Sequence, residues 1–184
     1  MTPTADWGDV THVALFDALS AGNLLFYGAL SASQQVDSTH PLKIAAGDLD
    51  ISLTGAFSYF LANELLDHVL NSNNYATPGT SLYTALFTTT PGRDGTGGVE
   101  VSGGAYARKQ ITVWDAPVDG DTENTNLEAY TVATAAWGDV LGAGIYDAAT
   151  VGNLLLLGAL DATYPVENGD TFRFEAGALD ITFS

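Results

Sequence analysis

Apolar and polar residues alternate along much of this chain, which is the pattern of half-buried β-strands. The alternation predicts strands at residues 10–18, 24–30 and 82–88, where apolar residues cover part of the opposite face as well. Residues 31–41 are polar and are predicted to be mostly loop. Glycine, asparagine and proline mark the turns between strands. Further strands are expected at residues 42–44, 49–53, 106–114, 127–136, 140–147, 153–160, 171–175 and 178–183.

One segment changes to a spacing of three and four residues, which predicts a single helix over about residues 57–71. Phe57, Leu61 and Leu65 lie on the same face of this helix. We expect Leu61 and Leu65 to be buried against the strands. Asn71 begins a polar run that ends the helix.

The C-terminal part of this pattern occurs twice. The motifs W-G-D-V, G-N-L-L and A-G-x-L-D-I run through residues 7–51 and return, without a gap, at residues 137–181, roughly 130 residues later. The sequence therefore divides into a β-rich half unit at 1–54 and a main unit at 55–184. The half unit duplicates the C-terminal half of the main unit.

Antiparallel strands with short turns and one helix predict a mainly β fold. We expect the main unit to be an antiparallel β-sandwich or a barrel-like sheet with the helix beside it. The half unit offers about four short strands and no helix, which is too little apolar surface to fold alone. We expect it to pack on its own main unit as a pseudo-symmetric pair. Donation of its strands to a neighbouring subunit is the alternative.

The charge balance changes which partners are expected. The chain has 22 Asp and Glu residues against 5 Lys and Arg residues, a formal net charge of −17. Such a surface disfavours nucleic acid and acidic membranes, and no apolar run is long enough to span a bilayer. The acidity indicates solubility in a salty medium or, alternatively, an acidic face that docks on a basic partner. With no cysteine, disulfides and thiol chemistry are excluded.

Candidate chemistry is scarce. Residues 115–126 gather acidic side chains of the kind that bind Ca²⁺, but their spacing does not match an EF-hand loop, and a solvated acidic turn is the favoured interpretation. His12, His40 and His68 lie far apart without metal-ligand spacing. Neither a nucleophile elbow nor a P-loop is present. The sequence predicts no catalytic residue, cofactor site or metal site, and no enzymatic activity.

Two tryptophans occupy matched positions of the repeat. Trp7 and Trp137 each lie directly before a predicted strand. One interpretation is a stacking platform for carbohydrate, and the other is packing of the indole rings against the protein. Their position before a strand favours packing. The other matched pairs with related side chains are Phe16 with Tyr146 and Lys43 with Arg173.

Five motifs occur in order along the chain. They are L-L-D-H-V-L (65–70), L-Y-T-A-L-F-T-T (82–89), V-S-G-G-A-Y-A-R (101–108), A-A-W-G-D-V (135–140), and G-N-L-L with G-A-L. With these motifs, the chain resembles a family of small tailed-phage virion proteins, often labelled tail-fibre or virion-associated proteins. The resemblance covers residues 56–184, and residues 1–54 resemble the C-terminal half of the same family. It implies a non-enzymatic structural part of a virus particle, on its exterior.

Two virion roles fit this resemblance. One is a capsid decoration or cement protein on the head, and the other is a tail-fibre or spike component that binds a host receptor. A carbohydrate-binding module is a more distant alternative. The chain has no heptad run, collagen-like repeat or β-helix period for a fibre shaft, which favours decoration. The expected partners are the major capsid protein or other virion proteins, and further copies of the chain, with a trimer favoured.

Overall fold

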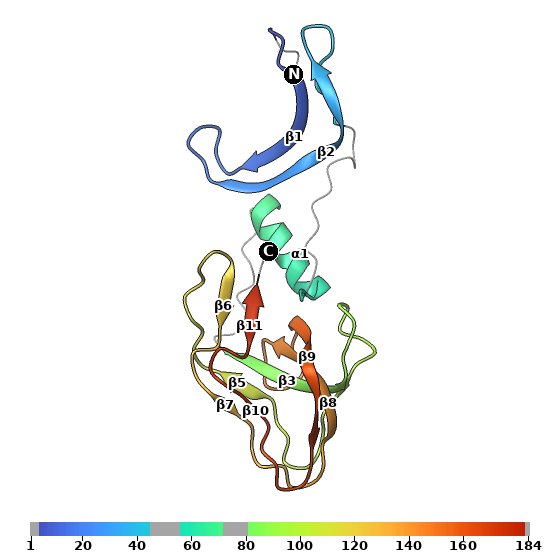
Figure 1. Ribbon diagram of the computed structural model, residues 1–184, viewed down its shortest axis with the longest axis vertical. Coiled ribbons are helices and arrows are strands. Elements are labelled where there is room, and N and C mark those ends of the chain that lie inside the picture. The colour runs from blue at the N-terminus through green and yellow to red at the C-terminus, as the bar shows by residue number, and fades with distance from the viewer. Residues whose placement is uncertain (1–3, 45–55, 72–80, 183–184) are drawn as a thin grey trace. The chain divides into compact units, whose positions relative to one another are not determined.

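The computed structural model of the protein describes residues 4–44, 56–71 and 81–182. The chain forms two compact units, Met1–Ser52 and Leu53–Ser184, called unit 1 and unit 2 below (Figure 1). The described strands pair antiparallel and close no barrel, and one helix accompanies them. The predicted mainly β, sandwich-like class with a single helix is confirmed. The packing of the half unit on the main unit stays a prediction.

Unit 1 is built on one long antiparallel hairpin. Strand β1 (Gly8–Phe16) pairs with strand β2 (Leu24–Val36) in a two-stranded sheet. The prediction of loop at residues 31–41 is therefore wrong for residues 31–36. The small and polar Ser and Gln side chains of this segment give no alternating apolar pattern, so the sequence does not predict a strand there. The strand forms because its backbone pairs with the first residues of β1. The strand expected at residues 42–44 is absent, and the strand expected at 49–53 lies outside the described residues.

A five-stranded antiparallel sheet forms the centre of unit 2 (Figure 1). Four strands follow the order β4-β3-β8-β9, and β5 also pairs with β3. Strand β3 therefore has β8 along one edge and β4 and β5 along the other. The strands are β3 (Leu82–Thr89), β4 (Val99–Glu100), β5 (Lys109–Ile111), β8 (Gly138–Tyr146) and β9 (Leu154–Val166).

Two small sheets complete the described strands of unit 2. One pairs β6 (Asp121–Glu123) with β11 (Asp180–Thr182), and the other pairs β7 (Glu128–Ala129) with β10 (Arg173–Phe174). The long strands predicted at residues 106–114 and 127–136 are thus only short paired stretches. Much of their remaining backbone bonds to loops, as the Tyr130 N–H does to the Phe172 carbonyl (2.9 Å).

The larger apolar core of unit 2 lies between strands β3 and β8 and the segments around residues 130–137 and 172–174. Leu86 of β3 and Val140 of β8 are completely buried in it. Aromatic rings fill the rest of the cluster, and neighbouring rings meet edge to face, the arrangement that ring quadrupoles favour. The buried rings are those of Tyr130, Trp137, Phe172 and Phe174.

Helix α1 (Tyr59–Asn71) packs on β9 and forms a second apolar cluster. Ser58 caps the helix, because its hydroxyl accepts the Leu61 N–H (3.2 Å). The Leu61 side chain is buried against Leu155 of β9. The predicted helix and the burial of Leu61 are confirmed. Leu65 packs on the same cluster but is only half-buried.

The helix contact gives a test of the fold. Leu61→Ala should lower the free energy of unfolding of unit 2 by about 2–5 kcal/mol, the usual cost of a large deletion in a core. Leu70→Ala is the matched control, because Leu70 lies on the same helix and is 46% exposed. Denaturant unfolding measures both. Equal, small losses for the two variants would mean that the helix does not pack on β9.

Candidate functional site

Unit 2 contains a second copy of the unit 1 hairpin. Strands β8 and β9 pair in the register of β1 and β2, and both hairpins shift register at the same two places. The matched end pairs are Gly8–Val36 with Gly138–Val166, and Phe16–Leu24 with Tyr146–Leu154. The repeat found in the sequence is therefore a repeat of one structural element.

An aspartate holds the turn of each hairpin. The Asp17 carboxylate accepts the Asn23 backbone N–H (2.7 Å) and its side-chain amide (2.8 Å), and Asp147 accepts the same two bonds from Asn153. The bonds from Asn23 hold the pKa of Asp17 below its ordinary value. A Cβ at Gly22 would lie 2.6 Å from the Asp17 oxygen, so the turn requires glycine before asparagine. This explains the repeated G-N motif.

In unit 2, neighbouring segments cover both edges of the hairpin. Strand β3 runs antiparallel along β8 over five residue pairs, from Tyr83 opposite Tyr146 onward. On the other edge, the Ser58 N–H donates to the Leu155 carbonyl (2.9 Å). In unit 1, the described residues place no strand beside β1 other than β2. The two copies of the hairpin thus differ in what surrounds them.

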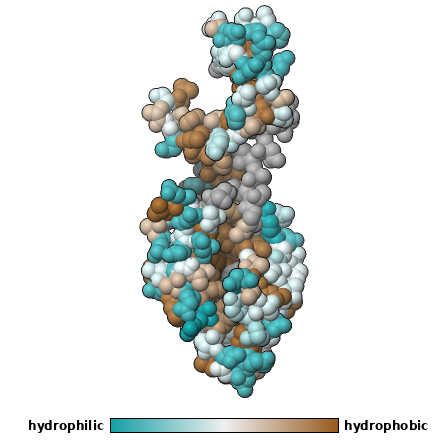
Figure 2. All heavy atoms as spheres, in the orientation of Figure 1, coloured by the Kyte–Doolittle hydropathy of each residue, from teal (hydrophilic) through white to brown (hydrophobic). Residues whose placement is uncertain are grey.

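The difference appears in the exposure of equivalent side chains. Leu154 and Leu155 of β9 are 7% and 4% exposed, whereas Leu24 and Leu25 of β2 are 50% and 37% exposed. Tyr27 of β2 is 78% exposed. Figure 2 shows apolar side chains on the surface of the hairpin of unit 1. Unit 1 therefore presents an apolar surface that unit 2 buries.

The matched tryptophans also differ. Trp137 is buried, its indole N–H donates to the Gly104 carbonyl (3.0 Å), and its ring meets Tyr106 edge to face at 5.3 Å. Packing, the favoured interpretation, is confirmed for Trp137. Trp7 is 51% exposed, although its backbone N–H bonds to Val36 as that of Trp137 bonds to the matching valine. The residues that cover Trp137 come from the part of unit 2 that is not repeated.

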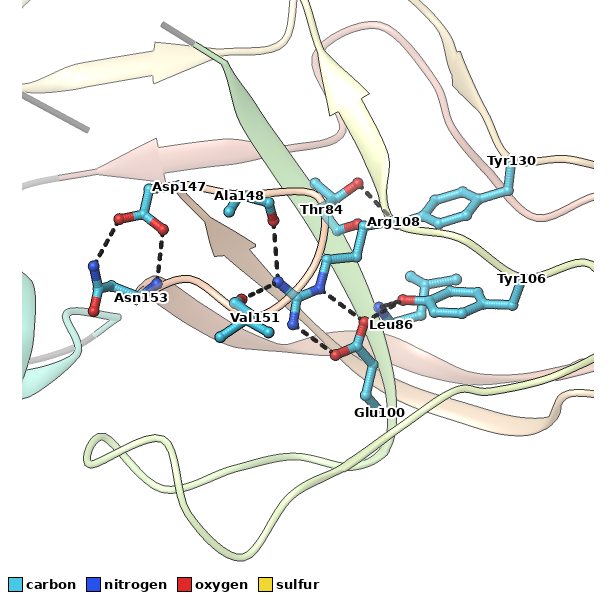
Figure 3. Close-up of polar contacts among 10 residues, drawn as sticks. All are labelled: Thr84, Leu86, Glu100, Tyr106, Arg108, Tyr130, Asp147, Ala148, Val151 and Asn153. Atoms are coloured by element: carbon cyan, nitrogen blue, oxygen red, sulfur yellow. Dashed lines mark hydrogen bonds and ion pairs between the residues drawn. The ribbon is translucent and has the colours of Figure 1, made fainter. Parts of the chain in front are cut away.

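Arg108 fastens the turn of the unit 2 hairpin to the rest of the sheet (Figure 3). Its guanidinium forms two parallel bonds with the Glu100 carboxylate, Nε to Oε1 at 2.9 Å and Nη2 to Oε2 at 2.8 Å. Its Nη1 donates to the carbonyls of Ala148 (3.1 Å) and Val151 (2.7 Å) in the turn. The guanidinium carbon lies 3.6 Å from the centre of the Tyr146 ring, a cation–π contact.

The half-buried phenol of Tyr106 extends this polar network toward the core, and the buried phenol of Tyr130 bonds to β3 beside it (Figure 3). The Tyr106 hydroxyl donates to Glu100 (3.1 Å) and accepts the Leu86 N–H (2.9 Å). The Tyr130 hydroxyl bonds to the carbonyl (2.9 Å) and the hydroxyl (2.8 Å) of Thr84. Burial raises the pKa of both phenols above the ordinary value, so they stay neutral and act as hydrogen-bonding groups. The network joins β3, β4 and the hairpin turn.

Sequence reasoning did not single out Arg108 or Glu100. The available signal was charge, because Arg108 is one of only 5 basic residues beside 22 acidic ones. Sequence spacing could not show which acidic residue pairs with it. Glu100 lies opposite Phe87 of β3, so the pair is defined by how the strands assemble.

The acidic segment 115–126 forms a hairpin. Val118 and Asp121 exchange backbone hydrogen bonds of 3.0 and 2.9 Å around Asp119 and Gly120, both of which have positive φ (54° and 90°). An Asp-Gly pair with two positive φ angles is the preferred two-residue hairpin turn. The predicted acidic turn is confirmed, and its Asp-Gly pair has a conformational role.

The three histidines belong to different segments and have different local surroundings. His12 has Nδ1 2.9 Å from the hydroxyl of Thr11, and His40 has Nδ1 3.1 Å from the Asp37 carboxylate. His68 lies in the last turn of α1. Among the described residues, no three His, Cys, Asp or Glu side chains gather as metal ligands would. The absence of catalytic, cofactor and metal sites stays a prediction.

A scan against protein families matches the chain to the family described as Podophage GP4 fiber I protein gp80, over residues 1–52 and 56–182. The chain belongs to this family. The two matched segments correspond to the half unit and the main unit of the sequence repeat. The chain is thus a member of a tailed-phage fibre family and a virion-associated protein. The predicted resemblance to tailed-phage structural proteins is confirmed.

A second comparison adds nothing to the gp80 family assignment. A search of curated proteins finds no match to the chain. In the part of the chain that the structure describes, no helix is long and apolar enough to cross a membrane. The family match therefore carries the functional argument.

The Arg108 network of this gp80-family chain can be tested by removing one charge. Arg108→Ala leaves the partly buried Glu100 carboxylate without its partner and frees two turn carbonyls. We expect a loss of about 3 kcal/mol in the stability of unit 2, the scale for breaking a buried ion pair. Hydrogen exchange should also speed up at residues 148–153 but not at the matching turn, 18–23, which has no arginine. An equal increase in hydrogen exchange in both turns would mean that Arg108 does not hold the turn at residues 148–153.

The two tryptophans form a matched pair of substitutions. Trp137→Phe removes the indole bond to Gly104 and leaves a gap among the core rings, so it should cost about 2–4 kcal/mol. Trp7→Phe changes an exposed ring at the equivalent position and should cost less than about 0.5 kcal/mol. Thermal or denaturant unfolding compares the two. Similar losses would mean that both indoles are buried in solution.

Proposed function

We propose that this protein is a non-enzymatic component of a tail fibre on the exterior of a tailed-phage particle. The family match over nearly the whole chain supports this proposal, because the family is described as a fibre protein. It favours the fibre role over the capsid decoration role that the missing shaft repeat suggested. A fibre is built from several segments, and only the shaft requires a repeated sequence pattern. A compact β-rich chain suits the segment that attaches the fibre or the segment at its end.

Protein–protein contact is the activity that the structure supports best. The described residues of unit 1 expose large apolar side chains over a hairpin whose copy in unit 2 is covered. Such surface is characteristic of interaction sites. The proposed partners are other virion proteins and further copies of the chain, with a trimer favoured. The net charge of −17 disfavours nucleic acid as a partner.

The location and copy number of the protein test this proposal. Quantitative mass spectrometry of purified particles, with the major capsid protein as internal standard, should give a few to a few dozen copies per particle. Antibody labelling in electron micrographs should mark the tail region. Hundreds of copies, with label over the head, would overturn the fibre role and support capsid decoration instead.

A further inference from the structure

We propose that the outer edge of β1 is a docking edge for an extended strand of another virion protein, which takes the place that β3 holds beside β8. The proposal starts from the repeat of the hairpin. The same backbone register occurs twice, and only in unit 2 does a described strand complete it. The filled copy therefore shows what geometry the open copy accepts.

The backbone groups at this edge can be assigned from unit 2. The Asp147 N–H bonds to the Asn153 carbonyl, toward the β9 side. Because backbone groups alternate between the two edges of a strand, Tyr146 and Gly144 face β3. Their equivalents in β1 are Phe16 and Ala14, so the N–H and C=O groups of these two residues point away from β2.

Strand β1 lacks three of the usual protections of an exposed edge, namely short length, lysine and proline. Natural edge strands are often very short or carry lysine or proline. β1 is nine residues long, G-D-V-T-H-V-A-L-F, and contains neither residue type. Adding a strand to such an edge gives affinity through main-chain hydrogen bonds, with side-chain fit supplying specificity.

The side chains show that the donor differs from β3. At Gly144, a Cβ would lie 2.9 Å from Leu154 of the same hairpin and 3.0 Å from the Phe87 ring of β3. At Gly142, it would lie 2.5 Å from the Thr90 hydroxyl and 2.9 Å from the Gly158 carbonyl of β9. Unit 1 has Ala14 and His12 at these positions. A strand that fits β1 must therefore carry side chains smaller than those of Phe87 and Thr90.

Availability also argues against β3 of a second copy of this chain as donor. Its β3 already has β8 along one edge and β4 and β5 along the other. A donor from another protein needs no such displacement. The donor should be an extended strand with small side chains where β3 and its C-terminal flank have Phe87 and Thr90.

A peptide titration on the full-length chain tests the docking edge. The probe is the β3 sequence, residues 81–90, carrying Phe87→Ala and Thr90→Gly, fused to a soluble carrier. Binding should slow amide exchange of Ala14 and Phe16 at least about tenfold. Val13 and Leu15 already face β2 and should change little. The unaltered β3 peptide is the control and should bind more weakly.

A proline variant supplies the second arm. Ala14→Pro removes an outward N–H and should abolish peptide protection, while β1 and β2 stay paired because their mutual hydrogen bonds are kept. Val13→Pro is the matched control, because it removes an N–H that faces β2 and should disrupt the hairpin itself. In phage carrying Ala14→Pro, fewer copies of the protein should be found per particle.

Three results would overturn the proposal. The first is protection of β8 amides without protection of Ala14 and Phe16. The second is equal binding of the altered and unaltered peptides. The third is protection of the β1 edge that rises with protein concentration without peptide, which would assign the edge to a second copy. None of these results bears on whether the protein belongs to the tail or to the head, which copy number decides.

Discussion

Strand β3 is the element on which unit 2 depends, because it pairs along both of its edges. Four consecutive residues of β3, from Thr84 to Phe87, are buried, and the strand bonds to β8 on one side and to β4 and β5 on the other. An unpaired buried peptide group is costly, so a strand in this position must have both neighbours. The hairpin of β8 and β9 is held in place by this requirement. The equivalent hairpin in unit 1 has no described counterpart of β3.

Side-chain polar groups fix the geometry that the strand pairing leaves open. Main-chain bonds join β3 to β8, but they do not determine where the turn between β8 and β9 lies. Arg108 does so by binding two turn carbonyls while its charge is balanced by Glu100. Because the guanidinium is planar and carries several N–H donors, one side chain can bind both the Glu100 carboxylate and the two turn carbonyls. The contacts of Arg108 with the turn are thus one feature that distinguishes the two copies of the hairpin.

The local sequence pattern predicted those elements whose structure is determined by their own residues. The spacing of Phe57, Leu61 and Leu65 specified the helix, and the G-N motif marked both hairpin turns. The end of β2 was missed, since Gln34 and Gln35 have no apolar signal and are ordered by their partners across the hairpin. The Arg108–Glu100 pair could not be found either, because choosing one carboxylate among many requires the strand order of the sheet.

The two tryptophans show why a repeat in sequence need not be a repeat in environment. Trp7 and Trp137 stand in the same motif and make the same backbone bond to a valine. Only Trp137 is covered, since Gly104, Tyr106 and Tyr130 belong to the part of the unit that occurs once. A half unit with this composition retains the side chains of a core without the segments that enclose them. Selection for solubility alone would favour replacing Leu24, Leu25 and Trp7 by polar residues. Their exposure on the hairpin of unit 1 is therefore better explained by a surface that is covered in the assembled particle.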